Sequence, residues 1–201
     1  MIEYIAVVFG ILSVWYAQKN KILVFPTGII SVLIYVYLTY ENKLYADTGI
    51  NIYYFIMSIY GWVLWTTKNK KIKKEISFNS KQENLISMSL CIFFFLIIQY
   101  ALNKTDSDVV FLDSITTALS LTGMLLLARR KLENWIYWII ADIIYIPLYM
   151  YKELYPTSLQ FFIFLILAIL GYRNWKKELN ISQIKHIEKE FKSEMKLLGY
   201  L

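Results

Sequence analysis

The 201-residue sequence contains few of the residues on which most enzymatic and metal sites depend. It has one cysteine, Cys91, and one histidine, His186, so it can form neither an internal disulfide nor a cysteine–histidine metal site. Its seven glycines form no phosphate-binding loop. Charged residues make up only 18% of the chain, below the share of about 25% that is typical of soluble domains. We therefore expect no enzymatic activity, no metal and no cofactor.

Hydrophobic residues, in contrast, make up 58% of the chain and occur in long uncharged runs. Seven runs have about 17–22 residues, the length that lets a helix cross a hydrocarbon core of about 30 Å. Transmembrane β-strands would instead show short segments of alternating hydrophobicity. The sequence therefore predicts an all-α polytopic membrane protein with seven transmembrane helices, at about residues 4–18, 22–40, 48–66, 84–102, 109–128, 134–151 and 155–173.

The basic residues are distributed unequally between alternate loops. Of the 21 lysines and arginines, all but Lys43, Lys104 and Lys152 lie after the first, third, fifth or seventh span. The positive-inside rule then places the N-terminus outside and the C-terminus inside. The net charge of +6 thus reflects membrane topology, and we expect no nucleic-acid partner.

The chain also contains an internal repeat. Residues 5–66 align without a gap on residues 115–176 and share 13 identities, including a Leu-Tyr pair, a glycine and a tryptophan. Parallel repeats joined by a linker helix, with a site between them, are a transporter architecture. We therefore expect a 3+1+3 arrangement: a first three-helix repeat (1–66), a basic cytoplasmic loop (67–82), a linker transmembrane helix (83–103), a second three-helix repeat (109–175) and a cytoplasmic amphipathic tail (176–201).

The sixth span carries a carboxylate, Asp142, close to the middle of the membrane. An ionised group at the bilayer centre costs about 2.5–3.5 kcal/mol on insertion scales, so it normally faces the bundle interior or a wet cavity. Trp138, Asp142 and Tyr145 follow one another at helical spacing and share one face. A carboxylate and an indole together suit a small, flat, cationic solute. The expected substrate-binding residues are Trp138, Asp142, Asn51, Ser31, Gln160, Tyr35 and Tyr145.

Less specific interpretations apply to several of these positions. A hydrogen bond to a neighbouring tyrosine or asparagine would also account for Asp142, and Asp142 could alternatively carry a coupling proton. We expect Trp62, Trp65 and Trp175, at span ends, to form an interfacial belt. No lysine lies inside a span, which excludes a retinal protein. The tail has apolar residues at helical spacing, typical of a helix on the membrane surface or at a partner.

The segments "ENWIYWIIADIIYIPLYM" and "LYADTGINIYYFIMSIYGWVLW" resemble the PnuC family of bacterial vitamin transporters, and the resemblance covers nearly all of residues 1–177. It implies a SWEET-like 3+1+3 fold in the bacterial inner membrane. It also implies uptake of nicotinamide riboside, a precursor of NAD related to nicotinamide mononucleotide, by facilitated diffusion. A cytosolic kinase then traps the imported vitamin.

The resemblance also implies a substrate motif, a tryptophan followed four residues later by asparagine, which falls on Trp138 and Asp142. The family tends to have asparagine where this chain has Ser31 and glutamine where it has Asn51, while Gln160 matches. Related PnuT members carry thiamine, which is the alternative substrate. A membrane sensor or scaffold that does not transport is the competing class. Membrane lipid is an expected partner, and a homo-oligomer is left open.

Overall fold

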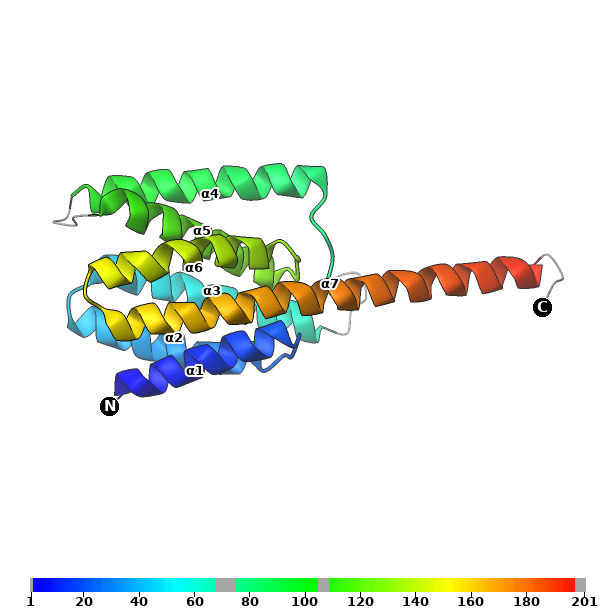
Figure 1. Ribbon diagram of the computed structural model, residues 1–201, viewed down its shortest axis with the longest axis horizontal. Helices are drawn as coiled ribbons and strands as arrows, with labels where there is room; N and C mark the ends of the chain where they lie inside the picture. Colours follow the sequence, from blue (N-terminus) through cyan, green and yellow to red (C-terminus); the bar gives the residue numbers. More distant parts are fainter. Residues whose placement is uncertain (1, 68–74, 105–108, 198–201) are drawn as a thin grey trace.

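The computed structural model describes residues 2–67, 75–104 and 109–197. The described residues form seven helices: α1 (Ile2–Gln18), α2 (Val24–Glu41), α3 (Tyr45–Thr66), α4 (Lys81–Leu102), α5 (Val110–Ala128), α6 (Asn134–Tyr151) and α7 (Tyr155–Leu197) (Figure 1). By length and composition α2, α4, α5 and the first part of α7 can each cross a membrane, and α1 is a shorter apolar helix. The helices α3 and α6 are rich in tyrosine and carry polar residues, Asn51 and Asp142 among them.

Six of the helices form a closed ring. In the order α1, α2, α3, α5, α6 and α7 each helix packs on the next, and α7 returns to α1. Helix α4 packs mainly on α5 and lies at the outer edge of the bundle (Figure 1). It also contacts α3, where the rings of Tyr53 and Phe94 meet edge to face at 5.8 Å. The ring therefore consists of two triplets, α1–α3 and α5–α7, which meet where α3 contacts α5 and where α1 contacts α7.

The turns inside the two triplets have the same backbone geometry at positions that are equivalent in the internal alignment. Four residues other than glycine have a positive φ: Asn20 (52°), Lys43 (57°), Arg130 (55°) and Glu153 (58°). In the alignment of the two repeats Asn20 falls on Arg130 and Lys43 falls on Glu153, so the left-handed residues repeat with the sequence. Each pair ends a helix with the same two backbone hydrogen bonds, such as Leu44 N to Thr39 O at 2.8 Å and its counterpart Leu154 N to Tyr149 O at 2.9 Å. This pattern is a Schellman motif.

An aromatic core joins the triplets at one end of the bundle, which we call the basic end because Lys19, Arg129 and Arg173 lie there. Its members are Phe25, Trp65, Trp135 and Trp175. The rings of Phe25 and Trp65 meet edge to face at 4.9 Å, and those of Trp135 and Trp175 do so at 5.5 Å. The second ring pair is the equivalent of the first in the repeat.

The expected interfacial belt is wrong for two of its three tryptophans. Trp65 is 4% exposed and Trp175 is 0% exposed, whereas Trp62 is exposed at 40%. Each buried indole crosses to the other triplet: Trp65 Nε1 donates to Ala128 O at 3.1 Å, and Trp175 Nε1 donates to Ala17 O at 2.9 Å. A buried indole N–H needs an acceptor, and the carbonyl groups at the ends of α5 and α1 supply it.

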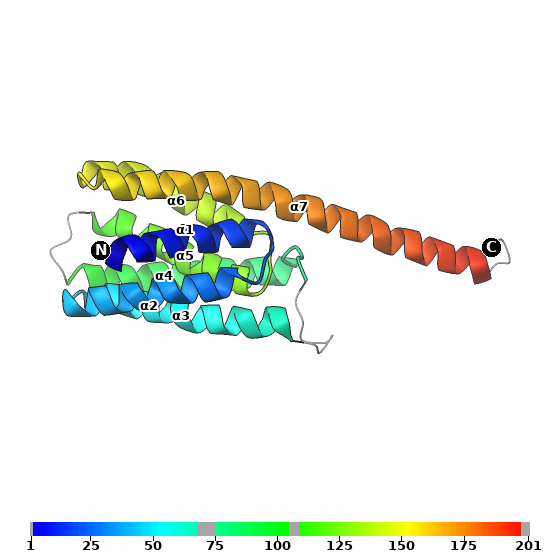
Figure 2. The ribbon, with the colours of Figure 1, turned by 90° about the horizontal axis from the view of Figure 1, so that it is seen from below.

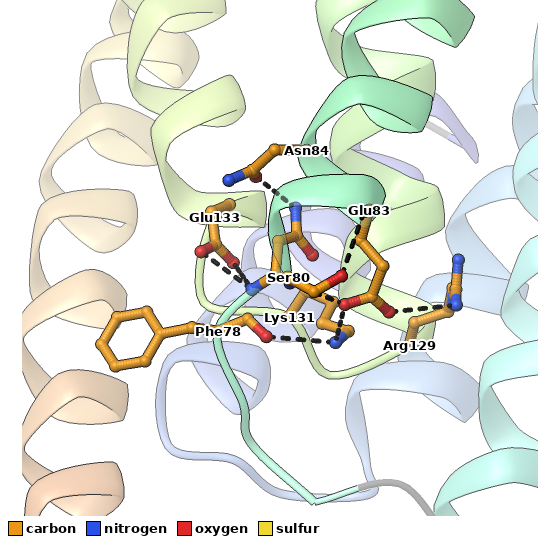
Figure 3. A network of polar contacts seen from close by, with 8 residues as sticks. Phe78, Ser80, Glu83, Asn84, Arg129, Lys131 and Glu133 are labelled. Carbon is orange, nitrogen blue, oxygen red and sulfur yellow. Dashed lines mark hydrogen bonds and ion pairs between the residues drawn. The ribbon is translucent and has the colours of Figure 1, made fainter.

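The linker helix α4 is attached to the second triplet by a polar network (Figure 3). Ser80 and Glu83 form a capping box at the start of α4, and the Glu83 carboxylate also accepts from Lys131 Nζ at 2.8 Å and from Arg129 at 3.3 Å. Lys131 Nζ donates to Phe78 O, and the Glu133 carboxylate accepts from the backbone N–H of Asn79. Because Arg129, Lys131 and Glu133 all lie on the α5–α6 turn, α4 is held to the second triplet.

The last helix does not end where its apolar span ends. Helix α7 continues through residue Leu197 and projects beyond the bundle at the basic end (Figures 1 and 2). Up to Leu197 the expected amphipathic tail is therefore a direct extension of the seventh span instead of a separate helix, and residues 198–201 lie outside the described residues.

Candidate functional site

Asp142 lies on the inner face of α6, two turns from the start of that helix at Asn134. Its side chain is 2% exposed. Among the described residues, none forms a hydrogen bond or ion pair with the Asp142 carboxylate. The hydrogen bond to a neighbouring tyrosine or asparagine that could have explained this residue is thus not made. Burial of a carboxylate without a partner costs free energy. An unpaired buried carboxylate is typical of a group that binds the polar or charged part of a ligand.

Aromatic and hydroxyl side chains from neighbouring helices gather around this part of α6. The Tyr145 phenol lies near Thr116, Thr117 and Ser120 of α5, and it is close enough to Asp142 for their charges to interact. The Tyr54 phenol of α3 lies near Ser120 and Tyr145, and the buried Ser120 hydroxyl has no hydrogen-bond partner among the described residues. Helices α3, α5 and α6 therefore converge at one place. This is the boundary between the two triplets, because α3 belongs to the first and α5 and α6 to the second.

An aromatic stack closes the same region toward α7. The rings of Tyr145 and Phe161 stack at 4.3 Å, and those of Tyr149 and Phe161 stack at 5.1 Å with an angle of 6° between their planes. Three rings from two helices thus form a continuous surface. Flat aromatic walls of this kind suit a planar ring.

Trp138 fits beside α5 because a glycine faces it. A Cβ added to Gly123 would lie 3.1 Å from Trp138 Nε1. The corresponding pair in the first triplet is reversed: Gly28 stands at the position of Trp138 and Ser13 at that of Gly123, and a Cβ on Gly28 would lie 2.9 Å from Ser13 Oγ. The second triplet has therefore exchanged a small residue on α6 for an indole and made room for it on α5.

A charged cluster lies at the end opposite the basic end. Lys152 Nζ binds both carboxylate oxygens of Asp113, at 2.9 and 3.0 Å. Asp47 of α3 lies close enough to interact with both charges. The phenols of Tyr149 and Tyr35 come next, since Tyr149 interacts electrostatically with Asp113, Asp47, Tyr35 and Tyr145. A line of carboxylates and phenols thus leads from this end to Tyr145 and Asp142.

The residues expected to bind substrate do not all occupy equivalent places. Trp138, Asp142 and Tyr145 share the inner face of α6, and Tyr35 lies further along the tyrosine line. Ser31 is buried and donates its hydroxyl to Ala6 O at 2.8 Å, so it holds α2 to α1. Asn51 is half-buried and donates to Asp47 O within α3 at 2.9 Å. Gln160 is half-buried on α7 beside Phe161.

Sequence reasoning left out Tyr54, Ser120, Gly123 and Phe161. Tyr54 and Ser120 lie on polar stripes of their spans, but such stripes more often serve helix packing. A signal for Gly123 and Phe161 is present in the repeat itself: Gly123 aligns with Ser13 and Phe161 with Asn51. At both positions the change alters the size or polarity of the side chain, which breaks the symmetry between the two halves at the candidate site.

Comparison with known proteins agrees with this architecture. The family model of the nicotinamide mononucleotide transporters matches residues 1–177. The nicotinamide riboside transporter PnuC of Escherichia coli is 25% identical, with 87% of this chain and 84% of that protein covered. The PnuC of Neisseria mucosa is 27% identical, with 86% and 71% covered.

A solved structure shows the same fold. The crystal structure of the vitamin B3 transporter PnuC superposes with a TM-score of 0.69 at 25% identity, covering 88% of this chain and 80% of that one. The chain therefore belongs to the nicotinamide mononucleotide transporter family and is a multi-pass transporter of the bacterial inner membrane.

Proposed function

We propose that this protein takes up nicotinamide riboside by facilitated diffusion, with alternating access to a site between the two triplets. Its relatives from Escherichia coli and Neisseria mucosa are named for that substrate. The single observation that carries the proposal is the buried Asp142 carboxylate, which has no partner among the described residues and lies near Trp138 and Tyr145. A pyridinium ring supplies the positive charge that would pair with the Asp142 carboxylate, and its flat face matches the aromatic side chains around it.

In this mechanism Trp138 stacks on the ring and Asp142 offsets its charge. The phenols of Tyr54 and Tyr145 and the Ser120 hydroxyl bind the polar substituents, and Asn51 and Gln160 are further amide contacts. The basic end faces the cytoplasm, as the loop charges predict. The substrate approaches from the opposite end along Tyr35 and Tyr149. A cytosolic kinase completes net uptake by phosphorylating the imported nucleoside.

Thiamine is the second candidate, because a carboxylate at position 142 can pair with an aminopyrimidine whereas an amide serves a ribose and a carboxamide. Asp142→Asn separates the two possibilities. It should weaken thiamine binding by about tenfold, the effect of losing one charge-assisted hydrogen bond. For nicotinamide riboside the affinity should fall less than for thiamine, because the new amide hydrogen-bonds the ribose or the carboxamide and so compensates part of the lost charge interaction.

The decisive test is a titration of the purified protein with each vitamin, followed by calorimetry and by tryptophan fluorescence. Saturable binding of nicotinamide riboside that is lost in Trp138→Ala supports the proposal. Trp62→Ala is the matched control, because that indole is exposed on α3, away from the site. If neither vitamin binds to the wild-type protein, the proposed substrate class is wrong. If binding survives in Trp138→Ala, the site lies elsewhere.

A further inference from the structure

The basic end of the bundle is closed by contacts that cross from one triplet to the other. Trp65 and Trp175 lie 5.9 Å apart between ring centroids, and each donates to a carbonyl of the opposite triplet. Asn174 Nδ2 of α7 donates to Gln18 Oε1 of α1 at 2.6 Å. For a site between the triplets to open toward this end, these contacts must separate.

One carboxylate reaches the two equivalent turns at once. Glu178, three residues beyond Trp175 on α7, accepts a hydrogen bond from Asn20 Nδ2 at 2.8 Å. It also interacts electrostatically with Arg130. Asn20 and Arg130 are the left-handed turn residues that occupy equivalent positions in the two repeats. Glu178 is therefore bound to the tip of the α1–α2 turn and lies near enough to the tip of the α5–α6 turn to interact with the charge of Arg130.

Arg130 extends this contact back to the aromatic core. Its guanidinium lies 4.0 Å from the centroid of the Trp65 ring, a distance at which a cation is attracted to an indole face. Burial lowers the pKa of the Arg130 guanidinium, and the carboxylates of Glu178 and Glu75 oppose that shift. Arg130 thus contacts the Trp65 ring of the first triplet and interacts with the Glu178 carboxylate of the second.

We infer that Glu178, with Arg130 and Asn20, is a lock that holds the basic end of the transporter closed. These residues do not touch the substrate; they are positioning residues that set the ratio of the two alternating states. The inference rests on the proposed alternating access, and it adds the residues that control it. Glu178 lies next to Leu179, which is still buried, and the projecting part of α7 follows directly after it.

The test measures access to the central site from each side of the membrane. Full-length protein in which Cys91→Ala removes the native thiol receives one reporter thiol, Ser120→Cys, beside Tyr54 and Tyr145. A membrane-impermeant, cationic methanethiosulfonate reagent is applied to inside-out and to right-side-out vesicles, and the rate of labelling is measured. Substrate is not needed, so the result does not depend on which vitamin is carried.

Glu178→Gln should raise the labelling rate from the cytoplasmic side by roughly three- to tenfold, the factor expected for loss of one charge-assisted hydrogen bond from the closed state. The labelling rate from the outside should fall, because any gain in the conformation that is open to the cytoplasm reduces the fraction of molecules that are open to the outside. Glu178→Asp should restore part of the closed population. Glu41→Gln is the matched control, since it makes the same change at the opposite end of the bundle.

Two results would overturn the lock. One is cytoplasmic labelling of Glu178→Gln that equals that of the parent and of Glu41→Gln. The other is faster labelling from both sides, which indicates a loosened structure instead of a shifted equilibrium. Failure of the wild-type protein to bind either vitamin, with the one-sided shift of the labelling rates intact, would refute the proposed substrate and leave the lock standing.

Discussion

Gly171→Ala is expected to destabilise the protein through one specific collision. A Cβ at position 171 would lie 2.5 Å from Cζ2 and 2.6 Å from Cε2 of the Trp135 indole. Carbon atoms in contact are normally about 3.5–4.0 Å apart, so the overlap is about 1 Å. The indole cannot move aside freely, because Trp135 is buried and packs edge to face on Trp175.

The magnitude follows from comparison with Gly49→Ala. A Cβ on Gly49 would meet nothing within 4 Å, and Gly49 is also inside a helix, α3. Both substitutions gain the same helix propensity, about 1 kcal/mol, so their difference isolates the collision. Overpacking of a core costs about 1–3 kcal/mol. At about 2 kcal/mol the two variants should differ in Tm by about 4–8 °C.

The assay is thermal unfolding in detergent, followed with a thiol-reactive dye at Cys91. This cysteine is half-buried in α4 and contacts Thr122 of α5, so the dye reports separation of these helices. Gly61→Ala provides an independent repetition, because its Cβ would lie 2.6 Å from Cζ of Phe25, the residue equivalent to Trp135. Equal melting temperatures for Gly171→Ala and Gly49→Ala would refute this account of the aromatic core.

Three further predictions concern the turns, the charged cluster at the end opposite the basic end, and the tail. Lys43→Gly should raise the free energy of unfolding by about 0.5–1 kcal/mol, because glycine adopts the left-handed conformation of this turn without the steric cost that a side chain adds. A lower Tm in the same assay would contradict this. Asp113→Asn should lower the uptake rate of a cationic substrate severalfold in low salt and much less in high salt, since it removes a carboxylate that attracts the substrate; a deficit independent of salt would show that Asp113 acts differently. Truncation after Ile181 should preserve uptake, whereas truncation after Lys177 also removes Glu178 and should shift labelling toward the cytoplasmic side; identical behaviour of the two truncations would argue against the lock.

The helices and the repeat could be predicted from the sequence because both depend on local chemistry. Uncharged runs of membrane length place the first six helices within a few residues of their observed bounds and place the start of α7, which then continues beyond its apolar run to Leu197. The internal alignment reappears in the left-handed turns and in the Phe25–Trp65 and Trp135–Trp175 pairs. The burial of Trp65 and Trp175 could not be predicted in this way. A tryptophan at the end of a span suits both a lipid interface and a contact between helices, and the choice depends on which helix lies opposite.

The candidate site is only partly predictable for a related reason. Asp142 stands out in any apolar helix, but in the sequence Ser31 looks equally functional, and only the structure shows its hydroxyl bound to Ala6 O. Conversely, Gly123 carries no chemistry of its own. Its contribution is the space that it leaves for Trp138, and space of this kind is visible only when two helices are placed side by side.

The two triplets are more symmetric at the basic end of the bundle than near its centre, and the two regions differ accordingly in the role that we propose for them. At the basic end the triplets match closely, with equivalent turns, equivalent ring pairs and reciprocal indole hydrogen bonds. Toward the centre they diverge, since Gly28, Val32 and Asn51 of the first triplet correspond to Trp138, Asp142 and Phe161 of the second. Rocking of two similar bodies favours a symmetric contact, whereas an asymmetric vitamin needs different groups on its two faces. In this chain the symmetric contacts lie at the basic end, and the asymmetric residues of the proposed site lie deeper in the same bundle.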